Sequence, residues 1–379
     1  MNIASPLVRT LAFISTLITL AIAPIARSSA VAFVQDGMQS QGGGYTIRNL
    51  VSDGFITAEH TDADLVNPWG ITPNPNGFMW VADNGTGLST LYDGNGVKQS
   101  LIVTIPVPPD GVAPAAPTGI VFSGGPEFVV TQGTLSGPSR FLFATEDGTI
   151  SGWAPNVNPT QAILAVDRSS EEAIYKGLAI AATGTARFLY ATDFHNNRID
   201  VFDSTFHLVT LPDAFLDPGI PRGYAPFGIQ NILGDLYVTY AKQDDEAEDD
   251  VAGEGFGFVD VFDASGHLLR RVASRGRLNA PWGLALAPAD FGPLSNTLLI
   301  GNFGDGRINA FDLRTGERLG LLRTRDGEPI AIEGLWGLSF GPGVANQPTN
   351  TLFFTAGPGD EEHGLYGRID PAEGGADLR

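Results

Sequence analysis

The stretch "PWGITPNPNGFMWVADNG", residues 68–85, decides the fold, because its parts return along the chain. "PWGL" stands at 281–284 and "LWGL" at 335–338. A glycine followed by an aliphatic residue opens six such segments, 49 to 58 residues apart, at Gly70, Gly119, Gly177, Gly228, Gly283 and Gly337. A fixed period of this length indicates a repeat architecture in which each repeat is one supersecondary unit.

Each repeat predicts four short strands. After the glycine come an apolar strand, a turn, a second strand such as "FMWVAD" (78–83) and a third such as "RIDVFD" (198–203). A fourth strand, such as "LLRRVAS" (268–274), has a weaker pattern. Strands of period two joined by Asn-Gly and Asp-Gly turns favour propeller blades. The sequence therefore predicts an all-β fold, a six-bladed β-propeller of four-stranded antiparallel blades over residues 45–371.

The two ends of this array predict how the ring closes. The sixth repeat stops one strand short, and "YTIRNLVSD" (45–53), which has the composition of a strand, precedes the first repeat. We expect this N-terminal strand to pair with the sixth blade as its outermost strand. Such closure removes the open edges that a linear array of sheets would expose.

The first 30 residues have the pattern of a secretory signal peptide. Arg9 precedes an apolar run over 11–25, and small residues follow up to Ala30. This run is too short for a membrane span, and the pattern predicts cleavage near Ala30. We therefore expect an exported protein, either secreted or periplasmic. A flexible N-terminal segment over 31–44 and a C-terminal tail over 372–379 would flank the propeller.

The composition excludes several classes of site and partner. The chain has no cysteine, which excludes disulfides, thiolate zinc and cysteine nucleophiles. Its formal net charge of −20 argues against nucleic acid or anionic lipid as partners, which need basic surface. No further stretch approaches the roughly 20 apolar residues of a membrane span. Calcium and cationic partners remain compatible with this charge.

The repeats also resemble a known pattern. "PWGITPNPNGFMWVADNG" (68–85), "YATDFHNNRIDVFDSTFHL" (190–208) and "GNFGDGRINAFDLRTG" (301–316) resemble NHL repeats. The chain is similar, over about residues 45–371, to a family of exported, mostly bacterial NHL-like propeller proteins of uncharacterised activity. The resemblance implies the six-bladed fold. It leaves function open, because related propellers include binding modules, lactonases and lyases.

One face of the predicted ring should hold a ligand site. The start of each inner strand and the loop after each second strand share this face, which would place apolar walls and a few polar groups at the channel mouth, the composition of a small-ligand pocket. The ligand-binding candidates are Trp69, Phe227, Lys242, Trp282 and Trp336. Packing between blades explains the three tryptophans equally well, because they occupy equivalent repeat positions. The acidic run 243–255 would leave the fourth blade at the same face, with a composition typical of a solvated loop.

A resemblance to six-bladed lactonases of the gluconolactonase type implies a divalent ion in the channel. Hard oxygen ligands suit Ca²⁺ or Mg²⁺, and the candidates are Asn67, Asp83, Glu146, Asp193 and Asn302. Asp83 and Asp193 also match the repeat itself, as turn residues do. Residues that depart from the repeat are the candidates for catalysis, namely Glu146, His195 and Glu333.

Three functions therefore remain open from the sequence. The first is an exported binding or scaffold protein that holds a small ligand, glycan or peptide at the channel mouth. The second is a metal-dependent hydrolase or lactonase that uses a divalent ion as a Lewis acid. The third is a lyase in which Glu146 or His195 transfers a proton.

Overall fold

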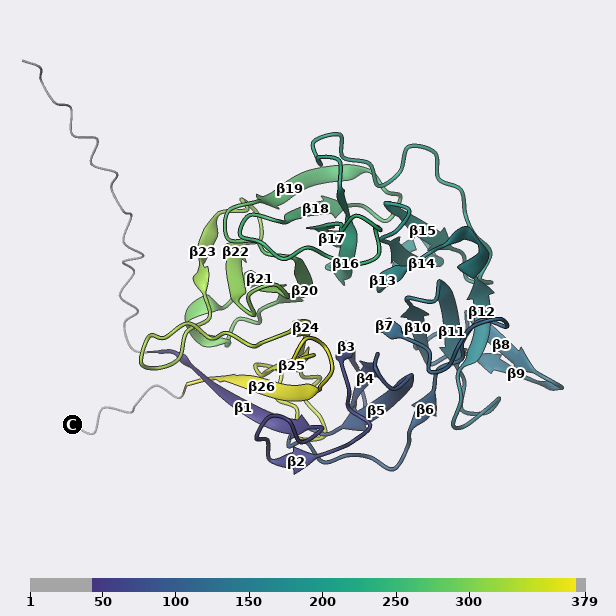
Figure 1. Ribbon diagram of the computed structural model, residues 1–379, viewed down its shortest axis with the longest axis horizontal. Coiled ribbons are helices and arrows are strands. Elements are labelled where there is room, and N and C mark those ends of the chain that lie inside the picture. Colours follow the sequence, from purple (N-terminus) through teal and green to yellow (C-terminus); the bar gives the residue numbers. More distant parts are fainter. Residues whose placement is uncertain (1–42, 373–379) are drawn as a thin grey trace, which may run out of the picture. The chain divides into compact units, whose positions relative to one another are not determined.

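Six β-sheets surround a central axis in the computed structural model, which describes residues 43–372 (Figure 1). The predicted six-bladed, all-β propeller is confirmed. Helix is confined, among the described residues, to the short 3₁₀ turns η1 (Ser169–Glu171) and η2 (Gly292–Leu294). The predicted signal peptide, almost all of segment 31–44 and almost all of the C-terminal tail lie outside the described residues and stay predictions.

Each blade is one antiparallel sheet whose first strand lines the central axis. Blade 1 consists of β3 (Pro68–Pro73), β4 (Met79–Asp83), β5 (Leu88–Tyr92) and β6 (Val103–Thr104). Blade 2 consists of β7 (Pro117–Phe122), β10 (Phe141–Thr145), β11 (Thr149–Trp153) and β12 (Ile163–Asp167). A separate hairpin, β8 (Val129–Gln132) and β9 (Leu135–Pro138), is inserted between β7 and β10.

The next three blades repeat this order. Blade 3 consists of β13 (Tyr175–Thr183), β14 (Ala186–Asp193) and β15 (Arg198–Phe202). Blade 4 consists of β16 (Tyr224–Ile232), β17 (Asp235–Lys242), β18 (Phe258–Phe262) and β19 (Leu268–Ser274). Blade 5 consists of β20 (Pro281–Leu286), β21 (Thr297–Asn302), β22 (Ile308–Asp312) and β23 (Arg318–Leu321). The expectation of four strands per blade is wrong for blade 3, where a single bridge from Phe202 to Leu208 replaces the outer strand.

The N-terminal strand closes the ring at blade 6, as predicted. Blade 6 consists of β24 (Leu335–Phe340), β25 (Leu352–Ala356), β26 (Leu365–Pro371) and β1 (Tyr45–Ser52), and the two-residue β2 (His60–Thr61) pairs parallel outside β1. β1 runs antiparallel to β26, from Tyr45 opposite Pro371 to Ser52 opposite Leu365 (Figure 1). The two ends of the propeller chain therefore hold each other in one sheet.

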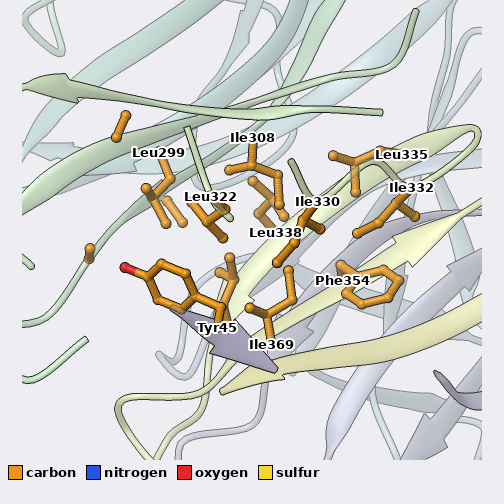
Figure 2. Close-up of a cluster of buried hydrophobic side chains, with 14 of the residues drawn as sticks. Tyr45, Leu299, Ile308, Leu322, Ile330, Ile332, Leu335, Leu338, Phe354 and Ile369 are labelled. Carbon is orange, nitrogen blue, oxygen red and sulfur yellow. The ribbon is translucent and has the colours of Figure 1, made fainter. Parts of the chain in front are cut away.

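Tyr45 at the start of β1 also enters the core between blades 5 and 6. Its ring lies with Leu299, Ile308 and Ile369 in a cluster of buried apolar side chains, as Figure 2 shows. Its hydroxyl accepts a hydrogen bond of 3.0 Å from the backbone N–H of Leu294. Closure thus joins main-chain pairing to apolar burial, which is the main stabilising term in folding.

The repeated glycines are explained by close approach between neighbouring inner strands. A Cβ atom on Gly70 would lie 2.3 Å from the carbonyl oxygen of Thr118 in blade 2. A Cβ atom on Gly337 would lie 2.6 Å from the carbonyl oxygen of Trp69, which carries the pattern around from blade 6 to blade 1. The same clash with the next blade arises at Gly119, Gly177, Gly228 and Gly283. The glycine that recurs in each repeat is therefore a steric requirement of the ring.

Threonine hydroxyls strengthen the same contacts between blades. Thr118 donates a hydrogen bond of 2.6 Å to the carbonyl oxygen of Tyr175 in the next blade. Thr355 of blade 6 donates one of 2.6 Å to the carbonyl oxygen of Trp69 in blade 1. These buried bonds satisfy inner-strand carbonyl groups that face a neighbouring blade rather than their own sheet.

Candidate ligand site at the channel mouth

Six residues converge where the inner strands begin, one before each repeat glycine. They are Trp69, Thr118, Lys176, Phe227, Trp282 and Trp336. The aromatic members pack together with Phe194 and Phe303 in one cluster, which we term the aromatic floor. Within it, the rings of Trp69 and Trp336 stack at a centroid distance of 3.6 Å. Aromatic side chains thus fill the channel below its mouth.

Lys176 is the charged residue among these six, and its side chain is buried. The residue is 1% exposed, and its Nζ lies 2.5 Å from Oε1 of Glu146 and 2.9 Å from Oδ1 of Asp249. The same Nζ lies 5.2 Å from the ring centroid of Trp69 and 5.9 Å from that of Phe194, within the range of cation–π attraction. Carboxylates and ring faces therefore form a cage around one ammonium group.

The pKa of Lys176 follows from this cage. Burial alone would lower the pKa of the amine, but the charges of Glu146 and Asp249 outweigh burial and raise it. Lys176 is therefore a protonated ammonium at neutral pH and holds no free electron pair for nucleophilic attack.

A chain of polar side chains connects the mouth across blades 6, 1 and 2. Trp336 donates its indole N–H to Oδ1 of Asn67 at 3.0 Å. Asn67 donates its amide to Oε2 of Glu361 at 2.9 Å. Asn84 accepts a hydrogen bond from Asn67 at 3.3 Å and donates one to Oε2 of Glu146 at 2.8 Å. The floor, the amides and the acidic groups thus form one connected network.

A cavity of about 440 Å³, which we term the mouth cavity, lies above this network. Lys176 and Ile174 line it together with five acidic residues, Glu146, Asp147, Glu248, Asp249 and Glu361. Burial raises the pKa of Glu361, and the charges of Glu146 and Asp249 add to this rise. Burial also raises the pKa of Asp147. The mouth cavity thus holds five acidic side chains around one ammonium group, and two of these side chains bind protons more readily than free carboxylates do.

The acidic run lies between β17 and β18, as expected, but it is not simply a solvated loop. Gln243 donates its amide to the carbonyl oxygen of Phe194 at 2.7 Å, and Asp249 reaches Lys176 of blade 3. Burial raises the pKa of Asp250 to about 7, and one of its carboxylate oxygens is enclosed without a hydrogen-bond partner. The run therefore folds inward and supplies part of the mouth.

The aromatic ligand-binding candidates from the sequence lie mostly below the mouth. Trp69, Phe227 and Trp336 are 2% exposed or less. Trp282 is partly exposed and donates its indole N–H to the backbone carbonyl oxygen of Lys176 at 2.9 Å. Lys242 lies away from the cavity lining, with its Nζ 4.6 Å from the ring centroid of Phe256. Contact of these five residues with a ligand stays a prediction.

The structure separates the five residues that the sequence offers as metal ligands. Asn67 and Glu146 lie at the mouth, joined through Asn84. Asp193 is paired with Arg198 at 2.9 Å, and Asn302 bonds the carbonyl oxygen of Arg277. Asp83 is fully buried at the end of β4.

The predicted site for a divalent ion stays a prediction. Among residues 43–372, no group of three or more acidic or histidine side chains is placed to hold an ion. The ammonium of Lys176 already lies between Glu146 and Asp249, the carboxylates closest to it. The described residues therefore give no support to chemistry routed through calcium or magnesium.

The three catalytic candidates are divided between different contacts. Glu146 pairs with Lys176. Nε2 of His195 lies 4.0 Å from Oε2 of Glu172, a long distance for an ion pair. Glu333 accepts a hydrogen bond of 3.0 Å from the backbone N–H of Gly359, and so positions the loop that carries Glu361.

The sequence places Lys176 and Asn84 on the face of the channel mouth, although neither is among the residues chosen there as ligand-binding, metal or catalytic candidates. It does not single out Asp249 or Glu361 for the site. A signal for Lys176 is present, since "YKGL" places a lysine where four other repeats place an aromatic residue. Asn84 follows directly on the nominated Asp83. Asp249 belongs to the acidic run 243–255, which the sequence places at this face without distinguishing one carboxylate from another. The sequence contains no comparable signal for Glu361.

Comparison with known proteins finds viral relatives. The chain is 38% identical over 331 residues to the uncharacterised protein R648 of Acanthamoeba polyphaga mimivirus, covering 86% of this chain and 80% of the relative. It is 35% identical to protein L690 of the same virus, covering 86% and 85%. No family model matches the sequence, so the likeness to NHL repeats and to bacterial proteins stays a resemblance.

Solved structures support the fold alone. A protein of unknown function from Bacteroides thetaiotaomicron VPI-5482 superposes with a TM-score of 0.52 at 11% identity, over 87% of this chain and 76% of that one. Virginiamycin B lyase from Staphylococcus aureus superposes with a TM-score of 0.48 at 13% identity, over 86% of this chain and 99% of that one.

In the described part of the chain, no helix combines the length and apolar character needed to cross a bilayer.

Proposed function

The chain belongs to the family of the mimivirus proteins R648 and L690, and we propose that its channel mouth binds the ammonium group of a small cationic ligand. The observation that carries this proposal is the position of Lys176. Its ammonium, held by Glu146 and Asp249 over the rings of Trp69 and Phe194, is an internal example of the chemistry that this mouth accommodates.

Charge balance supports the same ligand class. Five of the seven residues that line the mouth cavity are acidic, and Lys176 is its single cation. A second positive charge would be attracted to carboxylates that form no ion pair with Lys176, above all Glu361, which accepts a hydrogen bond from the neutral amide of Asn67. An anionic ligand would meet repulsion from the same groups.

The cavity also has the size for a small molecule. Its volume of about 440 Å³ falls within the usual range of ligand pockets, roughly 300 to 1,000 Å³. Binding is favoured over catalysis because Lys176 is protonated and the nominated acid and base, Glu146 and His195, have separate partners. A lysine nucleophile would require a lowered pKa.

The proposal is tested with a simple dication. We expect isothermal titration calorimetry to detect 1,5-diaminopentane and not its neutral analogue 1,5-pentanediol. Glu361→Gln removes one carboxylate and should weaken diamine binding about tenfold, the scale of one charge-assisted hydrogen bond. Binding should tighten from pH 6 to pH 8, because Asp250, with a pKa of about 7, gains its charge in this range.

The matched control is Glu317→Gln, which removes an exposed glutamate from the opposite face. It should leave the affinity unchanged. Equal affinity of the diamine and the diol, or equal weakening by both variants, would overturn the proposal, because binding would then not depend on charge at the mouth.

A further inference from the structure

A second cavity lies on the opposite face of the ring, between blades 1 and 2. It has a volume of about 570 Å³, and we term it the blade 1–2 pocket. Its lining comes from the loop between β3 and β4, from the ends of β7 and β11 and from the start of β10, all at the face away from the mouth cavity. The two cavities therefore have no lining residue in common.

The pocket has a fixed aromatic wall. Trp80 stacks on Phe141 at a centroid distance of 3.9 Å, and its centroid lies 4.8 Å from that of Trp153. Phe78 and Phe122 are only half-buried, so part of each ring stays open at the pocket. Rings held by packing offer apolar contact area without a large loss of side-chain entropy on binding.

Several polar groups in the lining have no partner among the described residues. Within residues 43–372, no acceptor pairs with the indole N–H of Trp80, which is 2% exposed, and the side chains of Asn76 and Ser100 make no hydrogen bond. Asn76 and Ser100 are exposed, and the Trp80 N–H is not among the enclosed polar atoms without a partner, so all three groups can bond water or a ligand. Amide and hydroxyl groups can both donate and accept, so these groups match a ligand that carries several hydroxyls.

The charge of the pocket is the reverse of that at the mouth. Arg140 is the one charged residue among the lining residues, and no acidic side chain accompanies it. Its guanidinium is exposed and has no ion-pair partner within the described chain, although the protein carries 42 acidic residues. A free guanidinium is a fork of donors that fits the two oxygens of a carboxylate.

We propose that the blade 1–2 pocket binds a saccharide residue that carries a carboxylate, of the uronic acid type. The apolar face of the pyranose ring would contact Phe78 and Phe122. Its hydroxyls would pair with Asn76, Ser100 and the indole N–H of Trp80, and its carboxylate with Arg140. The size of the pocket is sufficient for one or two such residues.

The test compares an acidic disaccharide with a neutral one. Digalacturonic acid and lactose are titrated into the full chain, with binding followed by saturation-transfer NMR and calorimetry. We expect digalacturonic acid to bind, lactose to bind at least tenfold more weakly, and Arg140→Gln to remove this preference. Arg222→Gln removes an arginine elsewhere that is also exposed and has no ion-pair partner among residues 43–372. It is the control and should change nothing.

The outcomes separate the proposal from its alternatives. Equal binding of both sugars, or unchanged affinity in Arg140→Gln, would overturn it, as would the absence of binding by either sugar. Because the Arg140 side chain is exposed, its replacement should leave the melting temperature unchanged, so that a loss of binding reports on the pocket and not on folding. Phe78→Ala provides a second variant that should weaken both sugars.

Discussion

Two sides of the channel mouth differ although the backbone repeats. Blades 1, 4, 5 and 6 begin their inner strands with aromatic residues, and blades 2 and 3 begin theirs with Thr118 and Lys176. The aromatic side packs into the floor, whereas Lys176 holds charge between Glu146 and Asp249. The glycine that follows has the same steric role in every blade. The two sides of the mouth therefore differ through the side chain of the residue before that glycine.

The same position in each repeat can serve packing in one blade and charge in another. Trp69 and Trp336 fill the channel and join blades 6 and 1, so their recurrence follows from packing. Lys176 occupies the equivalent place and is buried to the same degree, but it requires carboxylates from loops outside the repeat. The variants below remove one side of the mouth at a time.

The largest effect is expected on the aromatic side. Trp336→Ala should lower the free energy of unfolding by about 3–5 kcal/mol, the usual cost of truncating a buried aromatic residue. Its ring stacks on Trp69 and Phe303, and its N–H holds Asn67. Urea denaturation measures the change. Leu233→Ala, at an 82% exposed position, should cost less than about 0.5 kcal/mol, and similar values for both variants would show that the floor is not structural.

A smaller and pH-dependent effect is expected on the charged side. Lys176→Met leaves Glu146 and Asp249 without their cation and should cost about 2–3 kcal/mol at pH 8. The cost should fall towards pH 5, because burial raises the pKa of Glu361 and of Asp147 in the same cavity, and protonation of these two groups lowers the negative charge that Lys176 balances. Denaturation at both pH values measures this difference. Lys242→Met, where the ammonium lies over Phe256, is the matched control and should show little pH dependence.

A Lys176→Met cost that is equal at pH 5 and pH 8 would contradict the comparison. The lysine would then stabilise the protein through its apolar stem alone, as the aromatic residues do, and the two sides of the mouth would differ in shape rather than in charge.

The sequence predicts the ring well because its steric rules are local and periodic. Gly70 and Gly337 have to be glycines because neighbouring inner strands approach closely at these positions. The sixth repeat lacks one strand, which β1 supplies by pairing with β26. Because the repeat occurs six times, each such requirement is visible at six places in the sequence. Blade 3 has one strand fewer than expected, since no outer strand continues the bridge at Leu208, and blade 6 has one more because the short β2 pairs with β1.

The site is less predictable because its members do not repeat. Glu146, Asp249 and Glu361 come from loops of blades 2, 4 and 6, and each approaches Lys176 or Asn67 only in the closed ring. Asp83 was nominated for its residue type, but its position at the end of a buried strand gives it a different environment. Loop residues that meet across blades require the three-dimensional arrangement before they can be ranked.

The smallest effect tests the excess of negative charge directly. Burial raises the pKa of Asp250 to about 7, above its usual value of 3.8, so the folded protein binds more protons than the unfolded chain between about pH 4 and pH 7. Stability therefore falls as the pH rises through this window. Asp250→Asn should remove the penalty and stabilise the protein by about 1–2 kcal/mol at pH 8, with no gain at pH 4, as measured by urea denaturation. A variant less stable than the parent at pH 8 would mean that Lys176 already balances Asp250, and that the mouth has no unmet need for a cation.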